Sequence, residues 1–212
     1  NCEGVMGAGI ALEGKLRWPK MYEQYADRCQ KNEIIPGILD WWESDLSKER
    51  VLCFPTKASW KQPSKLDFIK KGLSTFANQY VEKKVSSIAM PHLGCSLGGL
   101  TWDEVRPLIV KVLTPLEGLK VELWEFDPHA EDPWYDTLVD LLENYPPEEL
   151  GMRLGLNKRA INALSSAARM DYVRSLSALQ GAPGVGEKTL EKIYKYLFRN
   201  GESHIQSSLD FL

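Results

Sequence analysis

Two glycine-rich segments constrain the fold of this 212-residue chain most strongly. Gly-Val-Met-Gly-Ala-Gly occupies residues 4–9, Gly-Cys-Ser-Leu-Gly-Gly occupies residues 94–99, and a helical pattern follows each. Glycine lets the backbone take positive φ angles and approach a ligand closely, and amides at a helix start can hold phosphate oxygens. The two loops fit a diphosphate held from both sides, although glycines also make simple tight turns. Neither loop has the Lys-Ser/Thr of an NTPase loop or the dinucleotide-binding spacing.

Around these loops, strand-like and helical segments alternate. Short apolar runs predict strands at 51–54, 85–90 and 121–126. Helical periodicity covers about 10–31 (broken at Trp18-Pro19), 65–83 and 102–113. Ser64 and Thr101 precede two of these helices as expected N-caps, with Asp67 and Glu104 at capping-box positions. The alternation predicts an α/β fold with a largely parallel central sheet.

The pattern changes after Asp127, where a polar, proline-containing stretch begins. Everything beyond it is typical of helices, at about 134–144, 147–154, 157–168, 170–179 and 187–199. We therefore expect an α/β domain at 1–127, a linker at 128–133, a small all-α domain at 134–200 and a tail at 201–212.

Composition excludes several classes of function. The net charge of −3 gives no global electrostatic case for nucleic-acid binding, so any basic surface must be local. No apolar run approaches the roughly 18 residues of a membrane-spanning helix. No signal peptide is visible, and the start at Asn1 suggests a fragment. The four cysteines and three histidines are not clustered, so we expect no metal and no cofactor, and reduced thiols in a cytoplasmic protein.

Three ordered motifs carry a family resemblance: residues 1–11, Phe54-Pro-Thr-Lys57, and residues 91–102. Together they resemble the macrodomain family, and most of all its DNA ADP-ribosyl glycohydrolase branch, the antitoxins of DarT/DarG pairs. The match covers about residues 1–127. It implies a three-layer α/β/α fold with a mixed, mostly parallel sheet, followed here by the helical domain. The two N-terminal strands usual in the family, which carry an adenine-binding aspartate, are missing, so no adenine partner is named.

The resemblance also implies a site. Lys57 matches the lysine needed for glycohydrolase activity, and the two loops match the segments that contact the distal ribose and the diphosphate. The residues expected to bind ADP-ribose are Asn1, Gly4, Val5, Met6, Gly7, Gly9, Ile10, Thr56, Gly94, Cys95, Ser96, Leu97, Gly98 and Gly99. Chemistry independently favours a lysine beside the ribose, as a nucleophile or as a charged positioning group. The alternative is an ordinary solvated loop lysine.

Several positions depart from the family pattern or remain open. Gly14 replaces a large apolar residue, and Ser96 replaces a glycine, where a Cβ would crowd the ligand if φ is positive. Gly98 stands where the related protein-directed hydrolase has a catalytic aspartate, which favours the DNA-directed branch. We interpret His92 as structural. Trp60, with the adjacent Lys61, either contacts the modified substrate or only packs.

The helical region contains a second resemblance. Residues 179–193 resemble a helix-hairpin-helix motif, in which Gly184-Val185-Gly186 would present backbone amides to a DNA phosphate and Lys188 would add charge. Residues 154–160 resemble a degenerate partner hairpin. Many such motifs only pack against other helices or proteins.

The leading hypothesis is an enzyme that removes ADP-ribose from DNA. A non-catalytic ADP-ribose reader and a protein-directed ADP-ribosyl hydrolase remain alternatives. The expected partners are ADP-ribose, ADP-ribosylated DNA and a cognate ADP-ribosyltransferase toxin, with no membrane.

Overall fold

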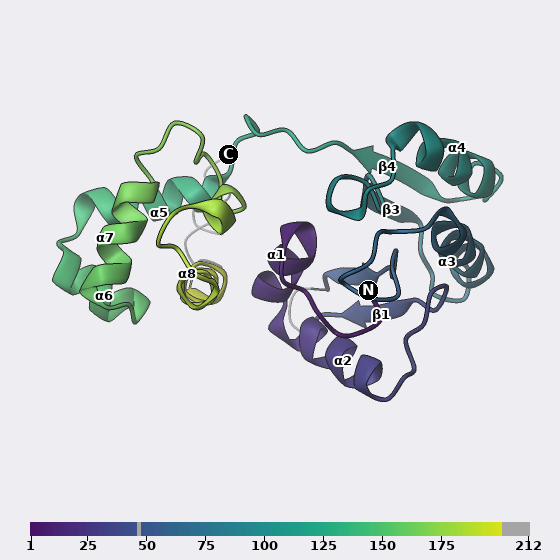
Figure 1. Ribbon diagram of the computed structural model, residues 1–212, viewed down its shortest axis with the longest axis horizontal. Helices are drawn as coiled ribbons and strands as arrows, with labels where there is room; N and C mark the ends of the chain where they lie inside the picture. The colour runs from purple at the N-terminus through teal and green to yellow at the C-terminus, as the bar shows by residue number, and fades with distance from the viewer. Residues whose placement is uncertain (46–47, 201–212) are drawn as a thin grey trace. The chain divides into compact units, whose positions relative to one another are not determined.

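The computed structural model describes residues 1–45 and 48–200, so the expected tail at 201–212 lies outside the described residues. The chain divides into two compact units (Figure 1). The first contains Asn1–Met6 and Pro19–Phe126, and the second contains Gly7–Trp18 and Asp127–Leu212. The predicted domain ranges stay a prediction, but the units show that the segment Gly7–Trp18 groups with the helical region.

The first unit has an α/β architecture, which confirms the predicted class. Its elements are, in chain order, α2 (Pro19–Gln30), β1 (Asp40–Glu43), β2 (Arg50–Cys53), α3 (Leu66–Gln79), β3 (Ser87–Pro91), the 3-10 helix η1 (Ser96–Gly98), α4 (Trp102–Leu113) and β4 (Lys120–Trp124). The predicted break at Trp18-Pro19 is confirmed, because α1 (Gly9–Arg17) ends there and α2 begins at Pro19.

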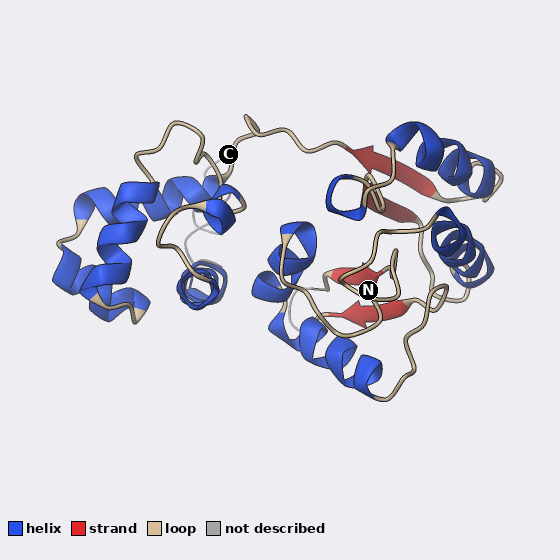
Figure 2. Ribbon diagram, in the orientation of Figure 1, coloured by secondary structure: helices blue, strands red, loops and turns tan. Residues whose placement is uncertain are grey.

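The strands form two small sheets in the described part of the chain (Figure 2). β1 and β2 pair antiparallel, with Asp40 opposite Cys53, because the short connection between them permits only a hairpin. β3 and β4 pair parallel, with Ser87 opposite Lys120, because the intervening helix α4 provides the crossover. The pairing is therefore mixed.

The core of the first unit lies between α3, α4 and the strands. Both helices are amphipathic, and their apolar faces pack on strand residues. The fully or nearly buried members are Leu39, Ile69, Leu73, Phe76, Met90, Val105, Ile109 and Leu113. On α3, a Cβ at Gly72 would lie 2.2 Å from the Phe54 ring. Gly72 thus makes room for Phe54, which anchors the start of the segment that leads to Lys57.

The ends of α3 correct one prediction, and α4 confirms another. Ser64 is not an N-cap: α3 begins at Leu66, and its N-cap Lys65 makes no side-chain capping bond. The Ser64 hydroxyl instead hydrogen-bonds the Thr56 hydroxyl at 2.9 Å, so a tertiary partner outcompetes the local one. In contrast, Thr101 and Glu104 form the expected capping box at the start of α4.

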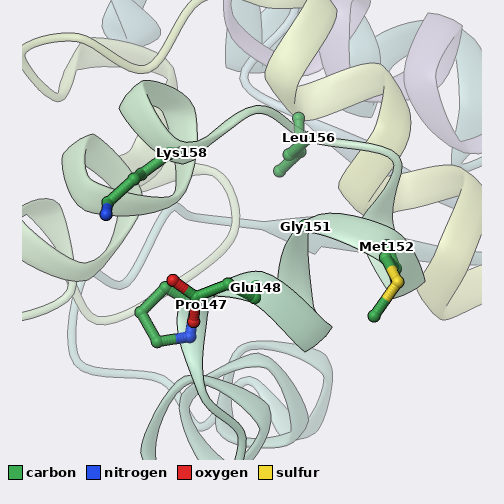
Figure 3. A pocket seen from close by; sticks show the side chains of 6 residues that line it. All are labelled: Pro147, Glu148, Gly151, Met152, Leu156 and Lys158. Atoms are coloured by element: carbon green, nitrogen blue, oxygen red, sulfur yellow. The ribbon is translucent and has the colours of Figure 1, made fainter.

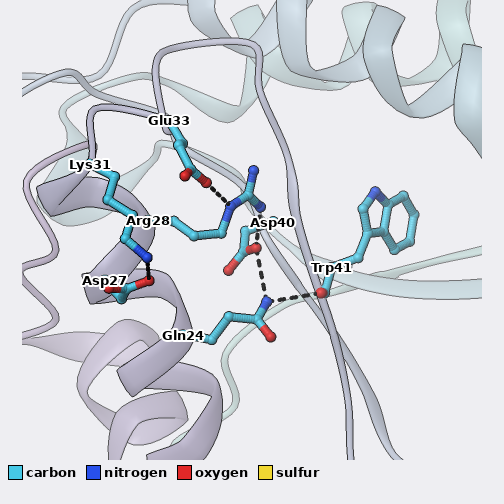
Figure 4. A network of polar contacts seen from close by, with 7 residues as sticks. All are labelled: Gln24, Asp27, Arg28, Lys31, Glu33, Asp40 and Trp41. Carbon is cyan, nitrogen blue, oxygen red and sulfur yellow. Dashed lines mark hydrogen bonds and ion pairs between the residues drawn. The ribbon is translucent and has the colours of Figure 1, made fainter.

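A buried carboxylate ties α2 to β1 (Figure 4). The Asp40 side chain is fully buried, and its Oδ1 accepts hydrogen bonds from Gln24 Nε2 at 3.0 Å and from the Arg28 guanidinium. Arg28 also donates to Glu33 at 3.0 Å, nearer the surface. Gln24 Nε2 also donates a hydrogen bond to the Trp41 carbonyl at 3.1 Å. The network fixes the side of α2 that faces the first strand.

The second unit is helical. It contains α1, α5 (Pro133–Asn144), α6 (Pro147–Leu154), α7 (Lys158–Ala167), the 3-10 helix η2 (Ala178–Gly181) and α8 (Glu187–Asn200). Helix α1 contacts α8, the Lys15 ammonium pairs with Glu187, and Leu12 and Leu16 are only 5% exposed within the helical core. Helix α1 is therefore a built-in part of this unit.

The predicted helix at 170–179 is wrong. This stretch forms turns that lead into η2. Two long-range hydrogen bonds hold the segment in this non-helical conformation. The Leu176 amide donates to Asp132 at 2.8 Å, and the Tyr135 hydroxyl donates to the Val173 carbonyl at 2.8 Å. These partners replace helical hydrogen bonds, so tertiary contacts override the local propensity.

Candidate functional site

Asn1 organises the first glycine-rich loop. Its Nδ2 donates to the Val5 carbonyl at 2.6 Å, and its Oδ1 accepts from the amides of Glu3 at 3.0 Å and Val5 at 3.3 Å. Gly4 has a φ of +72°, and a Cβ there would lie 3.2 Å from the Ala26 Cα. Only glycine fits that position without strain. The conformation of the loop from Asn1 to Met6 is thus set by the hydrogen bonds of the Asn1 side chain and by close packing on α2.

Lys57 lies where the first loop, the segment after β2 and the second loop meet. The Cys2 amide donates to the Ala58 carbonyl at 2.9 Å, which joins the first loop to the Lys57 segment. The Lys57 Nζ donates to the Leu97 carbonyl at 3.1 Å, which joins that segment to the second loop. The structure therefore brings the three sequence motifs together. Of the remaining first-loop candidates, Gly7, Gly9 and Ile10 belong to the second unit, where Gly9 begins α1.

The second loop presents backbone amides on turns with positive φ angles. Gly94, Ser96 and Gly99 have φ angles of +72°, +52° and +83°. Its internal hydrogen bonds use the amides of Cys95, Gly98 and Gly99, which leaves those of Ser96 and Leu97 outside these turns. Amides in such a turn can hold an anion. The φ of Ser96 is positive, so its Cβ is placed where we expected it to crowd the ligand.

Ser64 packs against the second loop, a role that no sequence pattern indicated. Its amide donates to the Gly98 carbonyl at 2.8 Å, while its hydroxyl contacts Thr56 at 2.9 Å. A Cβ at Gly98 would lie 2.6 Å from the Ser64 Oγ, and one at Gly94 would lie 3.1 Å from the Ser64 Cβ. A side chain at position 98 would therefore require Ser64 to shift.

The thiols near these loops are poor nucleophiles. Burial raises the pKa of Cys2 and of Cys95, and it raises the pKa of Cys53 to about 12. All four cysteines are free. Because the thiolate is the reactive form, these side chains stay protonated and unreactive at neutral pH. Lys57 is then the candidate for chemistry at the loops.

Two other sequence candidates have identifiable neighbours. The His92 ring stacks on Trp102, with ring centroids 3.8 Å apart and planes 13° apart, which supports the structural interpretation of His92. Trp60 is 53% exposed, and its amide donates to the Glu3 carboxylate at 3.0 Å. That amide, followed by the Ser59 hydroxyl, lowers the pKa of Glu3.

The helical unit holds the second set of candidates. Gly184 has a φ of +77°, Val185 is buried, and α8 begins directly after Gly186. Lys188 is exposed at the start of α8. The geometry is that of a tight turn before a helix. In the segment 154–160, which resembles a partner hairpin, Gly155 has a φ of +64° and lies between α6 and α7.

A shallow groove of about 440 Å³ also lies in the helical unit, at α6 and the start of α7 (Figure 3). Its lining residues are Pro147, Glu148, Gly151, Met152, Leu156 and Lys158. None of the residues predicted to bind ADP-ribose lines it, whereas Leu156 and Lys158 belong to the segment 154–160 that resembles a partner hairpin.

In the described ranges 1–45 and 48–200, no three His, Cys, Asp or Glu side chains are placed to hold a metal ion. Over the same residues, no helix has both the length and the apolar character that crossing a membrane requires.

Known proteins are similar in sequence and fold to the first part of the chain. A protein of Thermus aquaticus called DNA ADP-ribosyl glycohydrolase is 37% identical over 143 residues, which cover 66% of this chain and 39% of that protein. The chain thus matches well under half of that relative. The macrodomain of Mycobacterium tuberculosis DarG superposes with a TM-score of 0.58 at 33% identity, over 60% of this chain and 85% of that one.

A third comparison includes a bound ligand. The structure of Thermosipho africanus DarTG in complex with ADP-ribose gives a TM-score of 0.57 at 33% identity, over 63% of this chain and 38% of that one. The family model described as Macro domain matches residues 1–109, which is more than half of the chain. With its two glycine loops and the intervening Lys57 segment, the chain belongs to the macro domain family.

Proposed function

We propose that this protein is an ADP-ribosyl glycohydrolase that removes ADP-ribose from DNA, with Lys57 as its catalytic residue. The observation that carries the proposal is the 3.1 Å hydrogen bond from Lys57 Nζ to the Leu97 carbonyl. It holds the ammonium at the second glycine loop, where the diphosphate and the distal ribose of ADP-ribose are expected. The relatives named for DNA ADP-ribosyl hydrolysis and the ADP-ribose complex of a homologous structure support the same assignment.

The reaction requires water to add at the anomeric carbon of the distal ribose while the bond to the DNA base breaks and the base takes up a proton. Fixed backbone amides of the two loops would hold the phosphates and set the position of the ribose. A lysine at the rim acts as a nucleophile or as a charged group that positions the reacting atoms. Its hydrogen bond to the Leu97 carbonyl oxygen fixes the position of the amino group in either role.

The remaining ADP-ribose contacts are part of the proposal. They comprise Asn1, Gly4, Val5, Met6, Gly7, Gly9, Ile10, Thr56 and the loop Gly94, Cys95, Ser96, Leu97, Gly98 and Gly99. The backbone conformation supports the assignment of the two loops to ADP-ribose binding, because Gly4, Gly94 and Gly99 take positive φ angles that permit close backbone approach to a ligand.

A non-catalytic reader is the second candidate, and Ser96 is the observation that favours it. Its side chain projects from a loop position with a φ of +52° and is exposed there, so it would alter the seat of a phosphate. A protein-directed hydrolase is disfavoured, because Gly98 lacks the carboxylate of that mechanism and a side chain there would meet the Ser64 hydroxyl at 2.6 Å.

The deciding experiment incubates the full chain with ADP-ribosylated DNA and, separately, with ADP-ribosylated protein, and follows free ADP-ribose. We expect release from DNA. ADP-ribose binding without release from either substrate would support the reader, and release from protein alone would overturn the DNA assignment.

The helical unit completes the proposal as a DNA-contacting module. The exposed Lys188 and the hairpin Gly184-Val185-Gly186 would hold one backbone phosphate without reading sequence. We retain the domain ranges 1–127 and 134–200 for these two roles. A cognate ADP-ribosyltransferase toxin as partner and a cytoplasmic location belong to the same proposal; the free thiols support a reducing compartment.

A further inference from the structure

We propose that Trp60 and Lys61 form a substrate-recognition platform, on which an unpaired base next to the modified nucleotide stacks. This assignment rests on the proposed action on DNA and extends it to the polymer around the modified nucleotide. It makes Trp60 a specificity-determining residue, separate from the groups that hold ADP-ribose.

The platform is anchored, although it lies on a loop. The Trp60 amide donates to Glu3 at 3.0 Å, and a turn closes behind it, with the Gln62 amide donating to the Ser59 carbonyl at 3.2 Å. The Cys2–Ala58 hydrogen bond fastens the same segment to the first glycine loop. These bonds hold the backbone of the segment, and the Trp60 side chain remains 53% exposed and accessible to a ligand.

Its position matches the expected path of the substrate. Trp60 follows Lys57 by three residues, a separation that an extended chain spans in at most about 11 Å. Lys57 is at the proposed bond between ribose and base, so Trp60 lies within reach of the neighbouring nucleotide. Stacking on an aromatic ring requires a base whose face is not already covered by its own duplex neighbours.

The charges suit a nucleic-acid strand. The Lys61 ammonium lies 5.4 Å from the centroid of the Trp60 ring, and Lys65 is exposed on the same segment. A lysine so placed covers one face of the ring and can contact a phosphate while a base occupies the opposite face. The carboxylate of Glu3, which lies beside this segment, accepts a hydrogen bond from the Trp60 amide.

Trp124 provides a matched control. It is 62% exposed, but it lies on β4, and its Nε1 donates to Glu122 at 3.2 Å. No site residue proposed above lies on that strand. Truncating Trp124 removes an exposed indole of similar size without touching the Lys57 segment.

The test uses the full chain and two probes: a single-stranded oligonucleotide carrying one ADP-ribose, and the corresponding ADP-ribosylated mononucleoside. Trp60→Ala should lower kcat/KM for the oligonucleotide roughly 5- to 150-fold, the usual effect of losing one stacked base. Turnover of the mononucleoside and calorimetric binding of free ADP-ribose should stay within about twofold. Trp60→Phe should retain most activity on the oligonucleotide, and Trp124→Ala should behave as wild type.

Lys61→Gln should weaken oligonucleotide binding and reduce the slope of log affinity against log salt by about 0.7. Equal kcat/KM of Trp60→Ala and wild type on the oligonucleotide would overturn the platform. Equal losses on the two probes would overturn its assignment to the neighbouring base. If the wild type released no ADP-ribose at all, the proposed function would fail instead. Fluorescence anisotropy of the modified oligonucleotide with wild type and Trp60→Ala would then still test the platform, with unchanged affinity refuting it.

Discussion

Replacing Asp40 with alanine should destabilise the first unit by about 2 kcal/mol. Removing one partner of a buried ion pair generally costs about 3–5 kcal/mol, because the other charge is left without compensation. Two features of this site reduce the cost. The Arg28 side chain is 30% exposed and keeps Glu33 as a partner. In addition, the Asp40 Oδ2 is buried without a hydrogen-bond partner, which costs the folded state about 1–3 kcal/mol. Removing that atom removes this cost and offsets part of the loss.

Glu33→Ala provides the matched control, because it removes the other carboxylate that contacts Arg28. The Glu33 side chain is 48% exposed, so we expect a loss of at most about 1 kcal/mol. The assay is urea denaturation followed by tryptophan fluorescence, with Trp41 beside the network as a local reporter. Similar losses for the two variants, or a more stable Asp40→Ala protein, would refute the idea that the buried carboxylate fixes α2 against β1.

Gly98→Asp and Gly98→Ala should both reduce ADP-ribose affinity in calorimetry, because any Cβ there meets the Ser64 hydroxyl at 2.6 Å. Adding Ser64→Gly to Gly98→Ala should restore affinity, and no recovery in the double variant would refute the steric explanation. Deleting residues 127–212 should lower ADP-ribose affinity at least about tenfold, since it exposes Leu12 and Leu16 and removes about 3–6 kcal/mol of apolar burial from the helix that follows the first loop. Wild-type affinity of the shortened chain would show that α1 holds its position without the helical region.

Local patterns predicted the elements well where each segment supplies its own partners. The capping box at Thr101 and the break before Pro19 are both confirmed, since each depends on residues within one turn. Ser64 and the 170–179 segment were predicted wrongly for the opposite reason. Their hydrogen bonds go to Thr56 and to the Asp132–Tyr135 region, and no local pattern reveals partners so far along the chain.

The candidate site shows the same division. The order of the glycine loops and Lys57 indicated that they belong together, and the structure joins them through the Cys2–Ala58 and Lys57–Leu97 hydrogen bonds. The contact between Ser64 and Gly98, which shapes the second loop, depends on how two segments cross. Likewise, the packing of α1 against α8 could not be predicted, because the apolar positions of α1 do not identify the surface that they cover.

The most direct test of the central claim compares Lys57→Ala with wild type on ADP-ribosylated DNA, with calorimetry of free ADP-ribose in parallel. Lys31→Ala serves as the control, since that lysine is exposed on the segment after α2 and pairs with Asp27. We predict that Lys57→Ala lowers the rate of ADP-ribose release roughly a hundredfold or more. Its ADP-ribose affinity should stay close to wild type, because we propose that the two glycine loops supply most of the contacts. Release at the wild-type rate by Lys57→Ala would contradict the account.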